Sequence, residues 1–302
     1  MTVSAMIPGS PERADLLKAA VRGRSLWDDA RRRLFRNKAA VAGMVVLALM
    51  VALSLIGPLL VPYAYDTVTK SDVWSAPGVR GHLIGADSLG RDLLARLFAG
   101  LGVSLGIGVV ATAVSLVIGV AWGATAGYLG GRVDEVMMRI VDTLYSLPFI
   151  FFVILLMVVF GKNIFLIFLA IGAVEWLTMA RIVRGQTLSL KQKEFIEAAR
   201  AAGLTSSAII LRHIVPNLLG PVVVYVTLTI PAIIIAESFL SFLGLGVQAP
   251  MASLGTLIAG GAQDMEMAPW LLIFPSAVMI ITLMAFNFIG DGLRDAIDPK
   301  DR

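Results

Sequence analysis

The sequence predicts an all-α, polytopic membrane protein with six transmembrane helices and a helical cytoplasmic loop. Hydrophobic residues make up 58% of the 302 residues and charged residues only 15%, whereas soluble proteins are about half apolar and a quarter charged. A helix that crosses a bilayer needs roughly 20 apolar residues. Six segments near this length are present, at about 39–61, 99–126, 135–160, 164–182, 218–240 and 271–290.

We expect these segments to be helices and not strands, because a backbone inside lipid must satisfy its own hydrogen bonds. Pro148, Pro231 and Pro275 lie within three of them. Kinks are tolerated there if neighbouring helices cover the carbonyl groups that the prolines leave free. We therefore divide the chain into a cytoplasmic N-terminal segment, 1–38, and a six-helix transmembrane domain, 39–302.

The distribution of Lys and Arg predicts the orientation. With the N-terminus inside, 20 of the 25 basic residues fall in inner segments and 5 in outer segments. Because cytoplasmic segments are enriched in Lys and Arg, both termini are predicted to be cytoplasmic. The net charge of +4 is thus a topology signal, and we expect no binding of nucleic acid.

The N-terminal segment is too polar for a cleavable signal peptide, and the first apolar run is too long for one. Within it, Trp27, Arg31, Leu34 and Phe35 recur at helical spacing. This pattern indicates a helix on the cytoplasmic membrane surface, with arginines near anionic headgroups. An ordinary positively charged flank that sets the topology explains the same residues equally well.

A polar, helix-prone segment between the fourth and fifth spans, residues 191–216, is called the EAA loop below, after Glu197-Ala198-Ala199. Helix-forming residues dominate its first half, and Gly203 stands where a left-handed residue closes a helix. Thr205 or Ser206 can then cap a second short helix. The sequence predicts a helix-turn-helix in the cytoplasm.

One face of the first helix in this loop is built of small residues and one aromatic. Phe195, Ala198, Ala199 and Ala202 share it at three- and four-residue spacing. Such a face lets another surface approach closely, as insertion of a helix into a groove requires. Any alanine-rich helical loop shows similar residues, so this face alone has little specificity.

The spacing of the loop is more specific than its composition. Gly203 lies six residues after Glu197, and Pro216 lies nineteen after it. This spacing resembles the EAA motif of ABC-importer permeases, and the ending His213-Ile214-Val215-Pro216, in place of Ile-x-Leu-Pro, is similar to the peptide-permease branch. Other segments that resemble permeases of dipeptide and oligopeptide importers are 82–92, 127–131, 181–190, 212–217, 240–246 and 290–299.

This resemblance implies a type I ABC-importer permease of the bacterial inner membrane. The partners would be a second permease of similar architecture, two cytoplasmic ATPase subunits and a periplasmic peptide-binding protein. ATP and magnesium would bind to the ATPases, so this chain would hold no cofactor and no catalytic residue. In that family the whole cytoplasmic coupling loop, here 183–217, which contains the EAA loop, fits a cleft on the ATPase. The coupling residues implied are Glu194, Phe195, Glu197, Ala198, Ala199, Gly203, His213 and Pro216.

Three ionisable residues lie inside predicted spans, where charge is costly and marks a functional candidate. Asp142 lies near Arg139, and we expect a local ion pair. Glu175, beside Trp176, is the deepest, and Glu237 lies near the outer end of its span. We take Glu175, Trp176 and Glu237 as candidates for a translocation path. Alternatively, Glu175 bridges to a partner subunit and Glu237 reaches water.

Glycines recur along the second predicted span. Gly102, Gly106, Gly119, Gly123 and Gly127 are separated by multiples of four residues or close to it. Small residues on one face let helices pack backbone to backbone in lipid. Glycine is also simply frequent in membrane helices, and either explanation places this face against protein.

Other classes of function fit the sequence less well. Gly161-Lys162 lacks the upstream glycine and the following Ser or Thr of a phosphate loop, so the chain itself is not an ATPase. His82 and His213 are predicted on opposite sides of the membrane, and cysteine is absent, so no metal site is expected. A secondary transporter driven by an ion gradient is the main alternative, although no clear internal repeat is present. An ABC permease for dipeptides or another small solute also stays open.

Overall fold

The structure, a computed structural model, describes residues 26–161 and 163–297, and the regular elements in these residues are all helical. The main helices are α2 (Leu26–Arg36), α3 (Lys38–Leu60), α4 (Leu93–Leu129), α5 (Gly131–Tyr145), α6 (Phe149–Phe160), α7 (Ile164–Leu190), α8 (Glu194–Ala201), α9 (Ser206–Ile209), α10 (Val215–Phe242), α11 (Leu254–Gln263) and α12 (Trp270–Ile297). The all-α prediction is confirmed for this part of the chain. Most of the predicted N-terminal segment, 1–25, lies outside it.

Four helices are long and apolar enough to cross a bilayer. They are α3, α4, the stretch Ser206–Phe242 that contains α10, and α12. They correspond to the first, second, fifth and sixth predicted spans. The total of six crossing helices stays a prediction.

The third predicted span, 135–160, is not one helix. It is divided into α5 and α6 by a non-helical break at residues 146–148. The break has a local cause, because the ring of Pro148 disfavours a helical conformation in the preceding residue and removes a hydrogen-bond donor. Pro231 and Pro275, by contrast, lie inside α10 and α12.

The glycines of α4 bring it against α7. A Cβ atom added at Gly119, Gly123 or Gly127 would meet atoms of α7 at 2.5, 2.4 and 2.8 Å, all closer than van der Waals contact. At Gly102 the nearest atom is 3.5 Å away, and at Gly106 nothing lies within 4 Å. The predicted backbone-to-backbone packing is therefore confirmed for the C-terminal half of the glycine series.

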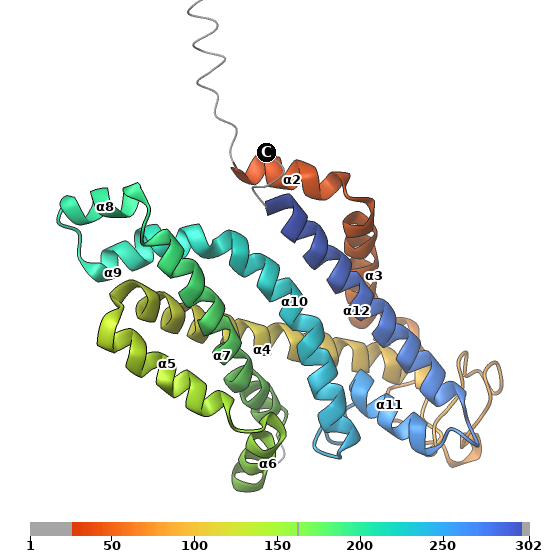
Figure 1. Cartoon of the computed structure of the whole chain (residues 1–302). Coiled ribbons are helices and arrows are strands. Elements are labelled where there is room, and N and C mark those ends of the chain that lie inside the picture. The colour runs from red at the N-terminus through yellow and green to blue at the C-terminus, as the bar shows by residue number, and fades with distance from the viewer. Residues whose placement is uncertain (1–25, 162, 298–302) are drawn as a thin grey trace, which may run out of the picture.

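A second close contact joins α3 to α12, beside α2 in Figure 1. A Cβ on Gly43 would lie 2.7 Å from the carbonyl oxygen of Ala285, and one on Gly292 would lie 2.4 Å from the Cβ of Ala40. The side chain of Asn37 accepts hydrogen bonds from the first backbone amides of α3. This cap separates α2 from α3 and fixes the point where the chain turns into the bundle.

The long segment between α3 and α4 is held together by charged groups. His82 is 1% exposed, and its Nδ1 lies 2.8 Å from Oδ2 of Asp92 while its Nε2 lies 3.3 Å from Oδ2 of Asp72. Hydrogen bonds from the Ser71 hydroxyl, and then from Arg80 and His82, hold the pKa of Asp72 below its ordinary value. The segment is thus an ordered cap on one end of the bundle.

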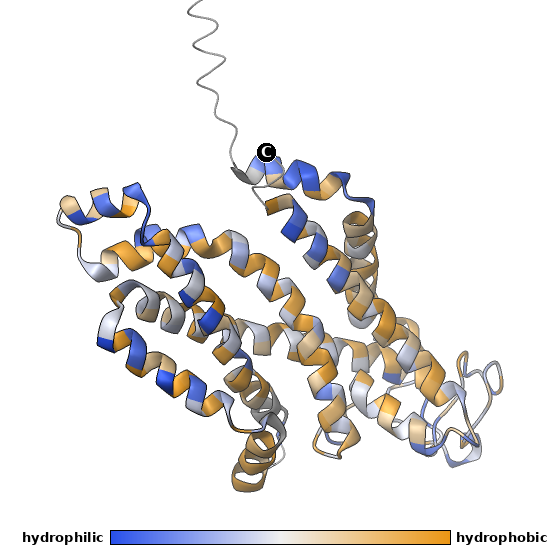
Figure 2. Ribbon diagram, in the orientation of Figure 1, coloured by the Kyte–Doolittle hydropathy of each residue, from blue (hydrophilic) through white to orange (hydrophobic). Residues whose placement is uncertain are grey.

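The two ends of the bundle differ in what they carry. Helices α8 and α9, helix α2 and the C-terminal end of α12 lie at one end, and α11 lies with the α3–α4 segment at the other (Figure 1). Apolar residues dominate the helices between them, while α2 and the α3–α4 segment are largely hydrophilic (Figure 2). The EAA loop, α2 and the C-terminal end of α12 thus share one end (Figure 1), as the predicted topology requires of these segments. The side of the membrane on which this end lies stays a prediction.

Candidate functional site

The first half of the EAA loop folds from purely local signals. Helix α8 ends at Ala201, and Gly203 follows with φ +78°. The amide of Leu204 donates to the carbonyl of Ala199 at 3.2 Å, and the amide of Gly203 donates to that of Arg200 at 2.9 Å. These two hydrogen bonds form a Schellman motif, in which glycine is favoured because its φ is positive. The predicted helix and its closing glycine are confirmed.

The second half of the loop leads directly into a long helix. The hydroxyl of Thr205 caps α9 by accepting from the amide of Ala208 at 3.3 Å. A π-helical turn, Ile210–Ile214, then joins α9 to α10, and Pro216 lies in the first turn of α10. His213 is half-buried, and its carbonyl accepts from the side chain of Asn217 at 2.6 Å. The predicted second helix therefore continues through Pro216 without ending there.

One face of α8 is buried in the protein. Ile196 and Ala199 are 0% and 7% exposed and belong to a hydrophobic cluster that includes Ile209 and Ile214. Ala199 was predicted to lie on an approachable face with Phe195, and this is corrected, because Ala199 follows Ile196 by three residues and shares its inward side. Ile196, the apolar residue that marks the buried face, was not among the residues predicted for this helix.

The opposite face of α8 is exposed. It presents the carboxylates of Glu194 and Glu197, the small side chain of Ala198 and the ring of Phe195, which is 40% exposed. Gly203 is also exposed at the end of this helix. The exposed face of α8 is therefore acidic and aromatic, and the other face of the same helix is packed against the protein.

Tyr128, near the end of α4, connects α8 to the bundle. Its hydroxyl accepts a hydrogen bond from Nε of Arg200 at 3.3 Å, and the guanidinium lies 5.2 Å from the ring centroid. The ammonium of Lys191 lies 5.7 Å from the same ring. Cation–π contacts of this kind hold the start of the loop and the C-terminal part of α8 to one aromatic side chain. The only signal in the sequence was an aromatic residue near the end of a span, which is common in membrane proteins.

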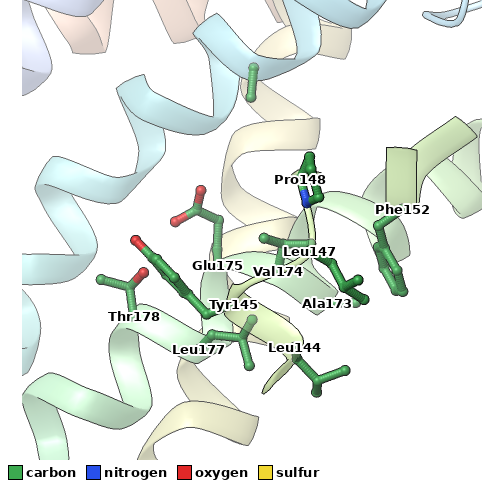
Figure 3. A pocket seen from close by; sticks show the side chains of 11 residues that line it. Leu144, Tyr145, Leu147, Pro148, Phe152, Ala173, Val174, Glu175, Leu177 and Thr178 are labelled. Carbon is green, nitrogen blue, oxygen red and sulfur yellow. The ribbon is translucent and has the colours of Figure 1, made fainter. Parts of the chain in front are cut away.

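A cavity of about 450 Å³ lies beside α7, where the break between α5 and α6 leaves space. Apolar groups, among them Phe152 and Pro148, form most of its wall. Figure 3 shows three polar groups pointing to the same side of it, towards α10: the carboxylate of Glu175 and the hydroxyls of Tyr145 and Thr178. The cavity thus combines an apolar lining with one acidic group.

Of the three residues predicted for a translocation path, only Glu175 lines this cavity. No hydrogen bond or ion pair joins its carboxylate to any residue that the structure describes. Trp176 is 9% exposed and packs edge-on against Trp122, with ring centroids 5.2 Å apart. Adjacent residues on a helix point in different directions, so Trp176 serves the packing of α7 against α4.

Glu237 is also placed away from the cavity. It is 0% exposed, and the hydroxyls of Ser241 and Ser253 each donate to its Oε1 at 2.6 Å. The Ser104 hydroxyl lies 3.4 Å from its Oε2 and accepts from the amide of Leu254 at 3.0 Å. The expectation that Glu237 reaches water is wrong, because α11 folds over it. Glu237 joins α4, α10 and the start of α11.

The arginines nearest the cavity are bound to aspartates of α5. Arg181 donates to Asp142 at 2.8 Å, and Arg184 forms a bidentate pair with Asp134 at 2.5 and 2.6 Å. The expected local pair of Asp142 with Arg139 is therefore replaced by a pair between helices. Its cause is tertiary, since α5 and α7 lie side by side and the sequence shows only separations along one helix.

Comparison with known proteins agrees with this architecture. The profile of the family described as "binding-protein-dependent transport system inner membrane component" matches residues 115–302. A second profile, the "N-terminal TM domain of oligopeptide transport permease C", matches residues 25–77.

Curated relatives resemble the chain over nearly its full length. It is 57% identical to the oligopeptide transport system permease protein OppC of Escherichia coli K12, covering 94% of this chain and 95% of the relative. It is 43% identical to OppC of Bacillus subtilis 168, covering 98% and 96%. The dipeptide transport system permease protein DppC of Bacillus subtilis 168 is 44% identical, covering 92% and 87%.

A solved structure of the MetNI methionine ABC transporter, in an inward-facing conformation, has a similar fold. The TM-score is 0.55 at 21% identity, covering 68% of this chain and 96% of the other. At this identity the likeness concerns the fold alone.

Proposed function

The chain belongs to the family of binding-protein-dependent transport system inner membrane components, and from this membership we propose that it is a permease subunit of an ATP-driven importer of oligopeptides. It lies in the bacterial inner membrane as a multi-pass protein with both termini in the cytoplasm. The full set of crossing helices is six, with α5–α6 and α7 adding two to the four long apolar helices. It performs no catalysis itself.

The exposed face of α8 is the observation that carries this proposal. This face is acidic and aromatic, and the other face of α8 is buried against the protein. The exposed residues are Glu194, Phe195, Glu197 and Ala198. A helix of this shape suits a groove on another protein. We assign this groove to a cytoplasmic ATPase subunit, and the two ATPases bind ATP and magnesium. A second permease of similar fold and a periplasmic peptide-binding protein complete the assembly.

The coupling step follows from where α8 is attached. It stands between α7 and the helical stretch that leads into α10, so a displacement of α8 is passed to two long helices. Closure of the ATPase pair would move α8, and the bundle would shift between inward- and outward-facing states. The peptide would pass the cavity beside α7, which contains Glu175.

Replacement of Gly203 by valine tests the coupling role. A β-branched residue at φ +78° costs on the order of 1–3 kcal/mol, so the end of α8 is displaced. Gly185→Val is the matched control, because Gly185 lies in α7, has no positive φ and has nothing within 4 Å of its Cβ position. In proteoliposomes containing the assembled complex, Gly203→Val should hydrolyse ATP with greatly reduced peptide uptake. Uptake at the wild-type level by that variant would contradict the coupling role.

The energy source is tested in the same vesicles. Peptide uptake should require ATP and persist when an ionophore removes the proton gradient. Uptake that collapses with the gradient while ATP is intact would show a secondary transporter instead.

A further inference from the structure

We propose that the cavity beside α7 binds the N-terminal ammonium group of the transported peptide, with the Glu175 carboxylate as its counter-ion. This inference rests on the proposed function, since it names the part of the substrate that the cavity recognises. It assigns a ligand chemistry to Glu175 and a supporting role to Tyr145 and Thr178.

Among the described residues, the Glu175 carboxylate is the unsatisfied polar group of the cavity. It opens into a cavity with mainly apolar walls, and no described residue donates a hydrogen bond to it or forms an ion pair with it. A carboxylate in such surroundings is costly unless a cation or donor satisfies it. Glu237 shows the contrast, because three serine hydroxyls surround its carboxylate. The Glu237 site is complete within the chain, whereas the Glu175 site lacks its partner.

Two arginines of α7 near the cavity are already paired with aspartates. Arg181 pairs with Asp142 at 2.8 Å and lies 4.2 Å from the ring centroid of Tyr145. Arg184 is held by both oxygens of Asp134. Each arginine is therefore tied to α5, and the positive charge that complements Glu175 comes from a ligand.

The polar groups of the cavity are arranged in a way that suits an ammonium group. The carboxylate of Glu175 and the hydroxyl oxygens of Tyr145 and Thr178 lie on one side of the cavity (Figure 3). An ammonium group has three N–H donors and no acceptor, and these three side chains offer it acceptor oxygens on one side. The remaining wall is apolar, with Phe152 and several leucines, and accepts first side chains of different shape. A volume of about 450 Å³ lies within the range of small-molecule sites.

Equilibrium binding to the purified complex tests the assignment. The probes are pentaalanine and N-acetyl-pentaalanine, which differ in the terminal charge, and the periplasmic binding protein is left out so that it cannot select between them. The wild-type complex should prefer the free amine by about tenfold or more, the order expected for a charge-assisted hydrogen bond. Glu175→Gln should abolish this preference, and Glu175→Asp should keep part of it. Glu135→Gln, on the exposed side of α5, is the matched control and should retain it.

Several results would overturn the assignment. Equal binding of both probes to the wild-type complex, or no binding of either, removes the ammonium site. A Glu175→Gln complex that loses its partner permease during purification shows that Glu175 bridges the subunits instead. ATP-dependent uptake by the wild-type complex is measured in parallel, with the periplasmic binding protein added. Absence of uptake would count against the proposed function, whereas uptake together with equal equilibrium binding of the two probes counts against the ammonium site alone.

Discussion

Replacing Gly123 by alanine should force α4 and α7 apart. The added Cβ would lie 2.4 Å from the carbonyl oxygen of Ala180 and 2.9 Å from the amide nitrogen of Arg184, whereas ordinary contact begins at 3.4 Å. Both neighbours are backbone atoms, so no side chain can turn aside, and the helices must separate by about 1 Å. Overpacking of this kind costs about 1–3 kcal/mol.

The control must share the helix propensity of the substitution, because alanine favours a helix over glycine by about 1 kcal/mol. Gly106→Ala provides it, since Gly106 lies in the same helix with nothing within 4 Å of the Cβ position. Gly123→Ala is thus expected to be about 1–3 kcal/mol less stable than Gly106→Ala.

Thermal unfolding in detergent, followed by tryptophan fluorescence, measures this difference. Trp122 and Trp176 pack between these helices with their ring centroids 5.2 Å apart and report on the contact directly. Gly106→Ala should melt at or above the wild-type temperature, and Gly123→Ala should melt below it. Equal melting temperatures for the two variants would refute the packing argument.

Three further predictions concern charged groups. Asp134→Asn breaks the bidentate pair with Arg184 and should lower stability by on the order of 1 kcal/mol, since the arginine is partly exposed; an unchanged melting temperature would contradict this. Glu237→Gln replaces one carboxylate oxygen, an acceptor, by an NH2 group, a donor, among three serine hydroxyls. The contact with α11 should weaken, so the backbone amides of α11 should exchange with deuterium faster. Unaltered exchange would show that Glu237 does not stabilise α11. Asp72 has a folded-state pKa below its ordinary 3.8, so its stabilisation is present above that pH and is lost as pH falls through the folded-state value. Protection factors in the α3–α4 segment, which are exchange rates corrected for the intrinsic effect of pH, should therefore fall on acidification below about pH 4 in the wild type, and Asp72→Asn should remove this dependence. A dependence that survives in the variant would contradict the assignment.

The EAA loop could be predicted closely because its signals are local. A run of helix formers, a glycine at the left-handed position and a threonine cap each act within a few residues, and α8 and α9 formed where they indicated. The inward orientation of Ala199 was not predicted, because the alanines were taken as one face without Ile196, the larger apolar residue beside them. Whether the exposed residues carry the coupling stays a prediction.

The parts that depend on tertiary contacts were predicted less well. Asp142 has a basic residue three positions away, but its partner, Arg181, comes from another helix. Glu237 was a candidate for the translocation path, with access to water as the alternative, because its position along the span says nothing of α11, which returns over it. The break at Pro148 was treated as a kink, although the structure separates α5 from α6 there. Glycine spacing did indicate that one face of α4 packs closely against protein, although the partner helix, α7, was not predicted.

Because α9 continues into α10, a small tilt at the EAA loop becomes a larger displacement at the far end of the helical stretch. From Ser206 to Phe242 the chain is helical over 37 residues, which corresponds to about 55 Å at 1.5 Å per residue. A tilt of about 6° at the α8 end would displace the far end by about 6 Å, if Pro221 and Pro231 do not absorb it. Glu237 connects that far end to α11. A small rotation imposed on one side of the membrane would therefore move the other side by more than the length of a hydrogen bond.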